Sequence, residues 1–169
     1  METLAELSAS RDEPGRPFVD DFLIPRKATA QAFRQVLNGT KLVLLEGAPF
    51  AGKSNVLREV ALRTAQHESI ATLYVEGGAG YGLIQSLADT LYRSLSWPVT
   101  REEARTWLSR VSQSAQYRLV LTIDGLDPAD DDARREIEDV SASLFGPGLT
   151  VIVALDDATS DRIVSSVKT

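Results

Sequence analysis

The residue types in segment 47–54, Gly-Ala-Pro-Phe-Ala-Gly-Lys-Ser, suit the binding of a phosphate chain. The segment fits G-x-x-x-x-G-K-[ST], in which glycines let the backbone N–H groups turn toward phosphate oxygens. We predict that Lys53 contacts the β- and γ-phosphates and that the Ser54 hydroxyl coordinates Mg²⁺. The competing interpretation is a chance match in an ordinary turn. The residues predicted to contact the nucleotide are Gly47, Ala48, Pro49, Phe50, Ala51, Gly52, Lys53, Ser54 and Asn55.

Two aspartates follow the apolar run 119–123 and supply the second half of such a site. A carboxylate at the end of another buried strand can hold Mg²⁺ opposite Ser54, so Asp124 is the second predicted metal ligand. Asp127 could orient or deprotonate an attacking water, so Lys53 and Asp127 are the candidate catalytic residues. Ordinary roles stay open for both aspartates: Asp124 could belong to an Asp-Gly turn, and Asp127 could cap a helix that starts near Asp130.

The elements that must position these residues alternate between strands and helices. Strands that are apolar on both faces are typical of a parallel sheet with helices on each side, so we predict a three-layer α/β sandwich. Lys53 is expected to begin a helix and to face solvent when no nucleotide is bound. A glycine-rich stretch, 77–82, lacks dinucleotide-loop spacing and is interpreted as a flexible connection. Apolar runs predict strands at 41–46, 70–75, 119–123 and 149–154, and helical spacing predicts helices at 27–38, 53–66, 84–95, 100–115, 133–144 and 160–167. Thr-Arg-Glu-Glu at 100–103 has the pattern of a capping box, which predicts the start of the helix at 100–115.

Composition limits the remaining function classes. The 169 residues, 43% of them hydrophobic, suit one globular domain, for which we expect a flexible arm at 1–17 and a nucleotide-binding unit at 18–169. The sequence has no cysteine and one histidine, which excludes disulfides and Cys-zinc or thiol chemistry. No apolar run approaches the roughly 20 residues of a membrane span, and the N-terminus lacks a signal peptide's apolar core, so we expect a cytoplasmic protein without membrane contact.

Negative charge is concentrated in the last quarter of the chain. The formal net charge is −6, and the segment 124–161 contains eleven Asp or Glu but only two Arg. Such a surface repels phosphate backbones, so we predict no general nucleic-acid binding. A locally basic pocket for one nucleotide is compatible with this distribution.

These motifs together resemble the STAND-type P-loop NTPases, an AAA-related branch of the ASCE ATPases that includes the NACHT and NB-ARC modules. The resemblance is carried by 47–54, with proline third in the loop, and by Ile-Asp-Gly-Leu-Asp at 123–127. The layout of Phe-Leu-Ile-Pro-Arg at 22–26, a helix and the first strand is also similar to the family. The resemblance implies an ASCE fold with strand 149–154 between the first and third strands, and a nucleotide contact for Arg26. It also implies a chain that ends after the fourth strand, before the family's lid and winged-helix region, which a partner or longer chain would supply, and a possible homo-oligomer.

The function predicted on this basis is Mg²⁺-dependent ATP binding with slow hydrolysis, in the nucleotide switch of a larger signalling or defence protein. The cofactors would be ATP or ADP and Mg²⁺. Hydrolysis is expected to be slow because the fourth strand ends in Ala-Leu-Asp at 154–156, where the family often places Ser or Thr followed by Arg. Two alternatives are a non-catalytic, nucleotide-dependent interaction module and a small-molecule phosphotransferase. The phosphotransferase needs lid arginines, for which the candidates are Arg93, Arg101, Arg105 and Arg110.

Overall fold

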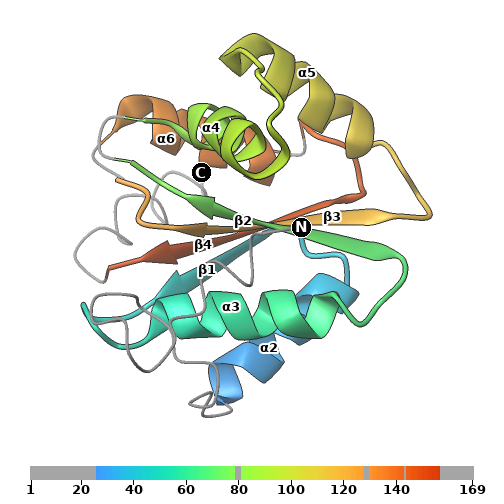
Figure 1. Cartoon of the computed structure of the whole chain (residues 1–169). Helices are drawn as coiled ribbons and strands as arrows, with labels where there is room; N and C mark the ends of the chain where they lie inside the picture. The colour runs from blue at the N-terminus through green and yellow to red at the C-terminus, as the bar shows by residue number, and fades with distance from the viewer. Residues whose placement is uncertain (1–25, 79–80, 128–129, 143, 157–169) are drawn as a thin grey trace.

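A four-stranded sheet lies between two layers of helices (Figure 1). The computed structural model describes residues 26–78, 81–127, 130–142 and 144–156. Helices α2 and α3 cover one face, and α4, α5 and α6 cover the other, which confirms the predicted three-layer α/β sandwich. In chain order the elements are α2 (Lys27–Leu37), β1 (Leu42–Glu46), α3 (Lys53–Thr64), β2 (Ile70–Glu76), α4 (Leu83–Leu95), α5 (Arg101–Val111), β3 (Arg118–Asp124), α6 (Asp131–Ser141) and β4 (Leu149–Leu155).

The strands are all parallel and lie in the order β1-β4-β3-β2. β4 therefore separates β1 from β3, the position that the family resemblance implied for strand 149–154. Because the strands run in one direction, the loop after β1 and the loop after β3 reach the same edge of the sheet. Phosphate-binding and metal-binding candidates from distant parts of the sequence are brought together there.

Alternation along the strands decides which side chains face each helical layer. In β4, Val151 and Val153 pack in the core beneath α4–α6, whereas Ile152 and Ala154 pack in the core against α2 and α3. This two-residue period follows from the pleat of a strand. Val120 of β3 also lies in the α2/α3 core, so every second residue of that strand faces α3.

Side-chain caps mark the first turns of two helices, α5 and α6. The Thr100 side chain accepts from the Glu103 backbone N–H and the Glu103 carboxylate accepts from Thr100, the capping box expected at the start of α5. The Asp130 side chain accepts from the Asp132 backbone N–H and caps α6. The predicted arm at 1–17 and the predicted helix at 160–167 lie outside the described residues.

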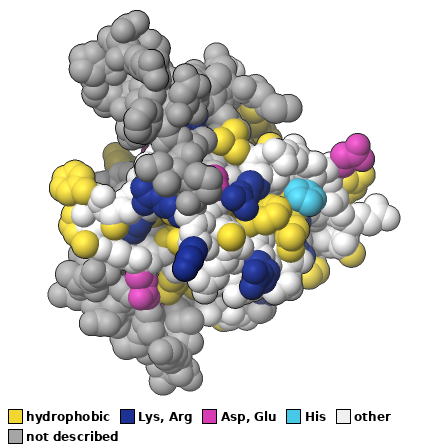
Figure 2. Space-filling view, turned by 90° about the horizontal axis from the view of Figure 1, so that it is seen from below, with side chains coloured by type: hydrophobic (Ala, Val, Ile, Leu, Met, Phe, Trp, Pro, Cys, Tyr) yellow, Lys and Arg dark blue, Asp and Glu magenta, His cyan; other side chains and the backbone are white. Residues whose placement is uncertain are grey.

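The surface over α2 and α3 differs in charge from the acidic segment after β3. Figure 2 shows this face from below, with several Lys and Arg side chains, the single histidine in cyan and few acids. Lys27 and Arg34 of α2 and His67 are exposed. The acid-rich composition of 124–161 therefore describes only part of the surface.

Across the described residues, no helix combines the length and apolarity needed to cross a membrane.

Candidate functional site

A cavity of about 470 Å³ opens at the carboxyl edge of the sheet, between the P-loop (residues 47–54) and the ends of β3 and β4. It brings together Lys53, Ser54, Asp124 and Asp127, which were predicted as site residues from two motifs about seventy positions apart in the sequence. The topology explains this convergence, because only β4 lies between β1, which leads into the P-loop, and β3, which ends at Asp124. The lining residues are Pro49, Phe50, Lys53, Ser54, Asp124, Gly125, Leu126, Asp127, Ala154 and Asp156.

The Lys53 ammonium lies inside the P-loop and not in solvent. Its Nζ donates to the carbonyl oxygens of Gly47 at 2.6 Å and Ala48 at 2.9 Å. It also lies 2.6 Å from Oδ1 of Asp156, with which it forms an ion pair. The Lys53 side chain is only 14% exposed, so the expectation of a solvent-facing lysine is wrong. The loop folds its carbonyls around the ammonium because the charge would otherwise lose hydration without compensation.

Arg26 contacts the backbone of the same loop. Its Nη1 donates to the carbonyl oxygen of Ala51 at 2.7 Å. Gly52 has φ +83°, and a Cβ built there would lie 2.2 Å from the Arg26 guanidinium. Glycine is needed at this position for two reasons: the left-handed backbone and the close approach of the arginine. Arg26 thus contacts the turn that begins α3, and the nucleotide contact that the family resemblance implies for it stays a prediction.

Phe50 has a backbone conformation that is unusual for its residue type. Its φ of +62° lies in the left-handed region, which non-glycine residues rarely occupy. The side chain is fully exposed, at 104% of its reference area, so burial of the ring does not offset the backbone strain. An aromatic residue held in this way at the rim of a cavity is a place where the loop stores strain.

Asp124 is held by a residue that the sequence analysis did not identify. The Tyr74 hydroxyl on β2 donates to Oδ2 of Asp124 at 2.8 Å. Burial raises the pKa of Tyr74 well above its usual range, and the charges of Asp124 and Glu76 raise it further. Tyr74 and Thr72 carry the two hydroxyl groups in the otherwise apolar run 70–75, which is the one signal available in the sequence. Its partner depends on the register, which pairs Tyr74 with Thr122 and leaves Asp124 on the same face.

The loops after β2 and β3 pack backbone against backbone beside Asp124. The Gly77 N–H donates to the Asp124 carbonyl oxygen at 2.7 Å. A Cβ on Gly77 would lie 2.7 Å from the backbone of Leu126, so glycine is required there for close approach. Gly77 therefore has a packing role that its interpretation as part of a flexible connection did not foresee.

Asp127 lines the cavity beyond this turn. The sequence left open whether the Asp127 carboxylate caps the next helix, and the structure gives Asp130 as the residue whose side chain caps α6. The backbone carbonyl of Asp127 accepts from the Asp130 N–H at 3.1 Å and closes the turn. The alternative interpretation of Asp127 as the helix cap is therefore wrong.

The donor set suits Mg²⁺ bound together with a phosphate chain. The Ser54 hydroxyl and the Asp124 carboxylate line one cavity, and oxygen ligands are those that Mg²⁺ prefers. Within the part of the chain that the structure describes, no three His, Cys, Asp or Glu side chains form a metal cage. Mg²⁺ typically uses one or two protein oxygens and completes its shell with phosphates and water, so the two donors fit.

Three of the four arginines considered for a phosphotransferase lid have other partners, and the fourth, Arg110, lies exposed on α5. Arg93 pairs with Glu76 at 3.1 Å, and Arg105 pairs with Asp139 at 2.6 Å. Arg101 pairs with Asp132 at 2.9 Å and with Glu136 at 2.8 Å. These three arginines belong to ion pairs of α4, α5 and α6, and they are not among the residues that line the P-loop cavity.

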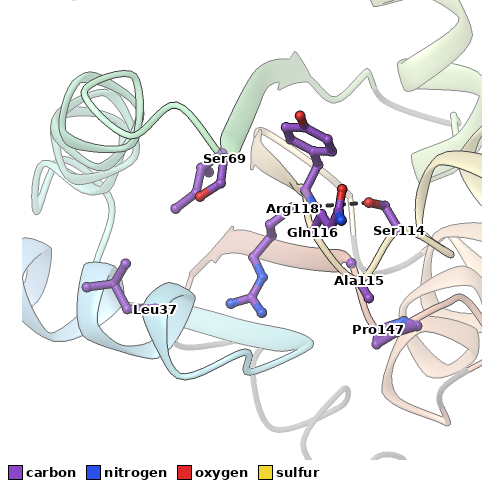
Figure 3. A pocket seen from close by; sticks show the side chains of 10 residues that line it. Leu37, Ser69, Ser114, Ala115, Gln116, Arg118 and Pro147 are labelled. Atoms are coloured by element: carbon purple, nitrogen blue, oxygen red, sulfur yellow. Dashed lines mark hydrogen bonds between the residues drawn. The ribbon is translucent and has the colours of Figure 1, made fainter.

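A second cavity of about 340 Å³ lies at the opposite, amino edge of the sheet (Figure 3). Arg118 is the charged residue among those that line it, and its guanidinium donates to the Val36 carbonyl at the end of α2. The Tyr117 N–H donates to the Ser114 hydroxyl at 2.9 Å, which closes the turn before β3. These contacts satisfy the end of a helix and a turn, so this cavity offers no comparable chemistry.

Comparisons with solved structures place this architecture among known folds. The chain aligns with Cdc6p from Pyrobaculum aerophilum at 19% identity and TM-score 0.58, covering 88% of this chain and 45% of that one. It aligns with Drosophila ORC bound to DNA at 16% identity and TM-score 0.57, covering 91% and 49% respectively. The replication initiator DnaA, bound to AMPPCP and single-stranded DNA, aligns at 14% identity and TM-score 0.51, covering 88% and 46%.

These similarities show that the chain has the AAA-related ASCE P-loop fold. At such identities they concern the fold alone, and the chain spans less than half the length of each of these three proteins. No protein-family model matches the sequence, and no curated protein matches it significantly.

Proposed function

We propose that this chain binds ATP or ADP with Mg²⁺ and hydrolyses ATP slowly, as the nucleotide switch of a larger STAND-type signalling or defence protein. The observation that carries the proposal is the convergence of Lys53, Ser54, Asp124 and Asp127 on one cavity. The fold supports it, since DnaA, which shares the fold, was solved with the nucleotide analogue AMPPCP.

Each of these side chains has a distinct role in the proposed reaction. Lys53 neutralises charge on the β- and γ-phosphates, and the P-loop N–H groups with the N-terminus of α3 hold the phosphate chain. Ser54 and Asp124 hold Mg²⁺, which would offset phosphate charge when bound. Asp127 orients the attacking water and can accept its proton on a carboxylate oxygen.

The charges around the cavity favour slow turnover. Of the ionisable side chains that line it in the described chain, Lys53 is a cation, whereas Asp124, Asp127 and Asp156 are acids. Arginine fingers contribute roughly 10³–10⁵ to the rates of related enzymes by stabilising charge on the leaving phosphoryl group. We therefore expect efficient hydrolysis to need an arginine from a lid region or from a second subunit.

A non-catalytic interaction module is the second candidate function, and the same acidic lining favours it. This alternative predicts the same nucleotide affinity and no phosphate release. A phosphotransferase is disfavoured because Arg93, Arg101 and Arg105 pair with other acids and are not among the residues that line the P-loop cavity. We also propose that the protein does not bind nucleic acids in general and that it is located in the cytoplasm.

The test is titration of the chain with labelled ATP, ADP and GTP, with and without Mg²⁺, followed by a phosphate-release assay. We expect Lys53→Ala to weaken ATP binding at least about a hundredfold, because charge-assisted bonds to phosphate are lost. Circular dichroism should show that this variant is folded. Equal ATP affinity of Lys53→Ala and the wild type would contradict the proposal, and rapid phosphate release would contradict slow turnover.

A further inference from the structure

Every hydrogen-bond donor of the Lys53 ammonium is already used within the protein. An ammonium group has three N–H donors and accepts no hydrogen bond. The three acceptors are the Gly47 carbonyl, the Ala48 carbonyl and Oδ1 of Asp156. A phosphate oxygen can therefore reach Lys53 only by replacing one of these three.

The three acceptors differ in how easily they can leave. The carbonyls of Gly47 and Ala48 belong to the P-loop backbone, and the Ala48 carbonyl also accepts from the Ala51 N–H at 3.1 Å. The Asp156 side chain is 51% exposed and follows directly after β4, so its carboxylate can turn into water. Water can solvate this half-exposed carboxylate once it leaves Lys53, and the arriving phosphate oxygen then compensates the charge of the largely buried ammonium. An incoming phosphate would consequently displace Asp156.

We propose that Asp156 is a specificity-determining residue of the nucleotide site. Its carboxylate occupies the direction from Lys53 in which a phosphate oxygen binds, so each anionic ligand must compete with it. Ligands with several negative charges, such as nucleoside di- and triphosphates or pyrophosphate, compete well, whereas a single inorganic phosphate competes poorly. This inference rests on the proposed nucleotide function and adds to it a carboxylate of the protein that competes with phosphate for Lys53.

The local charge balance predicts the size and conditions of the effect. Asp156 adds a third carboxylate to a cavity that already contains Asp124 and Asp127. Replacing this charge removes both the competitor and a source of repulsion for phosphate. The gain should be larger without Mg²⁺, since the metal offsets phosphate charge, and it should shrink at high salt because exposed charges are screened.

The experiment compares Asp156→Asn with the wild type, using ATP, ADP and pyrophosphate as probes in calorimetric titrations with and without Mg²⁺. We expect Asp156→Asn to bind Mg²⁺-free ATP and ADP about tenfold more tightly at low salt. The control is Glu68→Gln, which makes the same charge change at an exposed position before β2, at the far edge of the sheet. It should leave all affinities within twofold of the wild type.

The possible outcomes separate this inference from the proposed function. If the wild type binds nucleotide and Asp156→Asn binds it equally or more weakly, Asp156 is no competitor and the inference fails alone. A loss confined to Mg²⁺-dependent binding or turnover would assign Asp156 to the metal or the water instead. If neither the wild type nor Asp156→Asn binds any probe although both are folded, the proposed function fails as well. If Asp156→Asn does not fold, Asp156→Ser provides a second variant for the same comparison.

Discussion

At the P-loop edge, Lys53 pairs with Asp156, whose side chain is 51% exposed, whereas between α5 and α6 Arg101 pairs with Glu136, whose side chain is 4% exposed. Glu136 also accepts from the Ile84 backbone N–H at the start of α4, at 3.0 Å. In the first pair the carboxylate is the exposed partner, so we expect an anionic ligand to be able to replace it, whereas in the second pair the carboxylate is the buried partner and connects three helices. Burial of the carboxylate, and not the presence of opposite charges, distinguishes the structural pair from the one that a ligand is expected to open.

The largest effect is expected in the helical layer. Glu136→Ala should lower the free energy of unfolding by about 2–3 kcal/mol, because it leaves the Ile84 N–H without its acceptor and Arg101 with one carboxylate fewer. Urea unfolding would measure this loss, with the exposed Glu102→Ala in α5 as control. Nucleotide affinity should not change in the folded fraction. An unchanged stability would show that the buried Glu136 carboxylate is as replaceable as the exposed carboxylate of Asp156.

Asp124→Asn should give the opposite pattern, a change in binding with little change in stability. Asparagine keeps an acceptor for the Tyr74 hydroxyl and loses the charge that attracts Mg²⁺. We expect the Mg²⁺-dependent gain in ATP affinity to fall about tenfold, or about 1.4 kcal/mol. ATP titrations with and without Mg²⁺ would show it. A uniform loss in both titrations would place Asp124 among the positioning residues of the loop.

Tyr74 connects the two kinds of environment, since it is buried but bonded to a residue of the cavity. Its pKa in the folded chain is raised, so the unfolded chain loses the Tyr74 proton first as the pH increases. The resulting stability is fully present below about pH 10 and falls above it by about 1.4 kcal/mol per pH unit. Between pH 8 and 11 the wild type should lose about 1 kcal/mol more than Tyr74→Phe. The exposed Tyr117→Phe is the control and should behave like the wild type in urea unfolding.

The smallest effect concerns the strained backbone of the P-loop. Phe50→Gly should be more stable than Phe50→Ala by about 0.5–1 kcal/mol, because glycine adopts the left-handed conformation without strain and both variants lack the exposed ring. Thermal unfolding of the two variants would measure the difference. Equal stabilities would mean that the loop relaxes elsewhere, and the P-loop edge would then be more adaptable than its backbone angles indicate.

Much of the architecture followed from local patterns. Apolar runs predicted all four described strands to within about two residues of their ends, and the capping box predicted the start of α5. The position of β4 between β1 and β3 followed from the family resemblance and not from periodicity, because pairing order is not a local property. The close approach of Gly77 to Leu126 could not be predicted for the same reason.

The sequence by itself determined which residues could meet at the site, since the P-loop spacing and the aspartate after an apolar run are short-range patterns. Only the tertiary structure decided what each charge contacts. Lys53 and Asp156 are 103 positions apart, and Glu136 lies 52 positions from Ile84. Tyr74 reaches Asp124 only because β2 pairs with β3 in one register, and a shift of one residue would turn its hydroxyl to the other face. Contacts of this kind depend on strand order, register and burial, which no short stretch of sequence encodes.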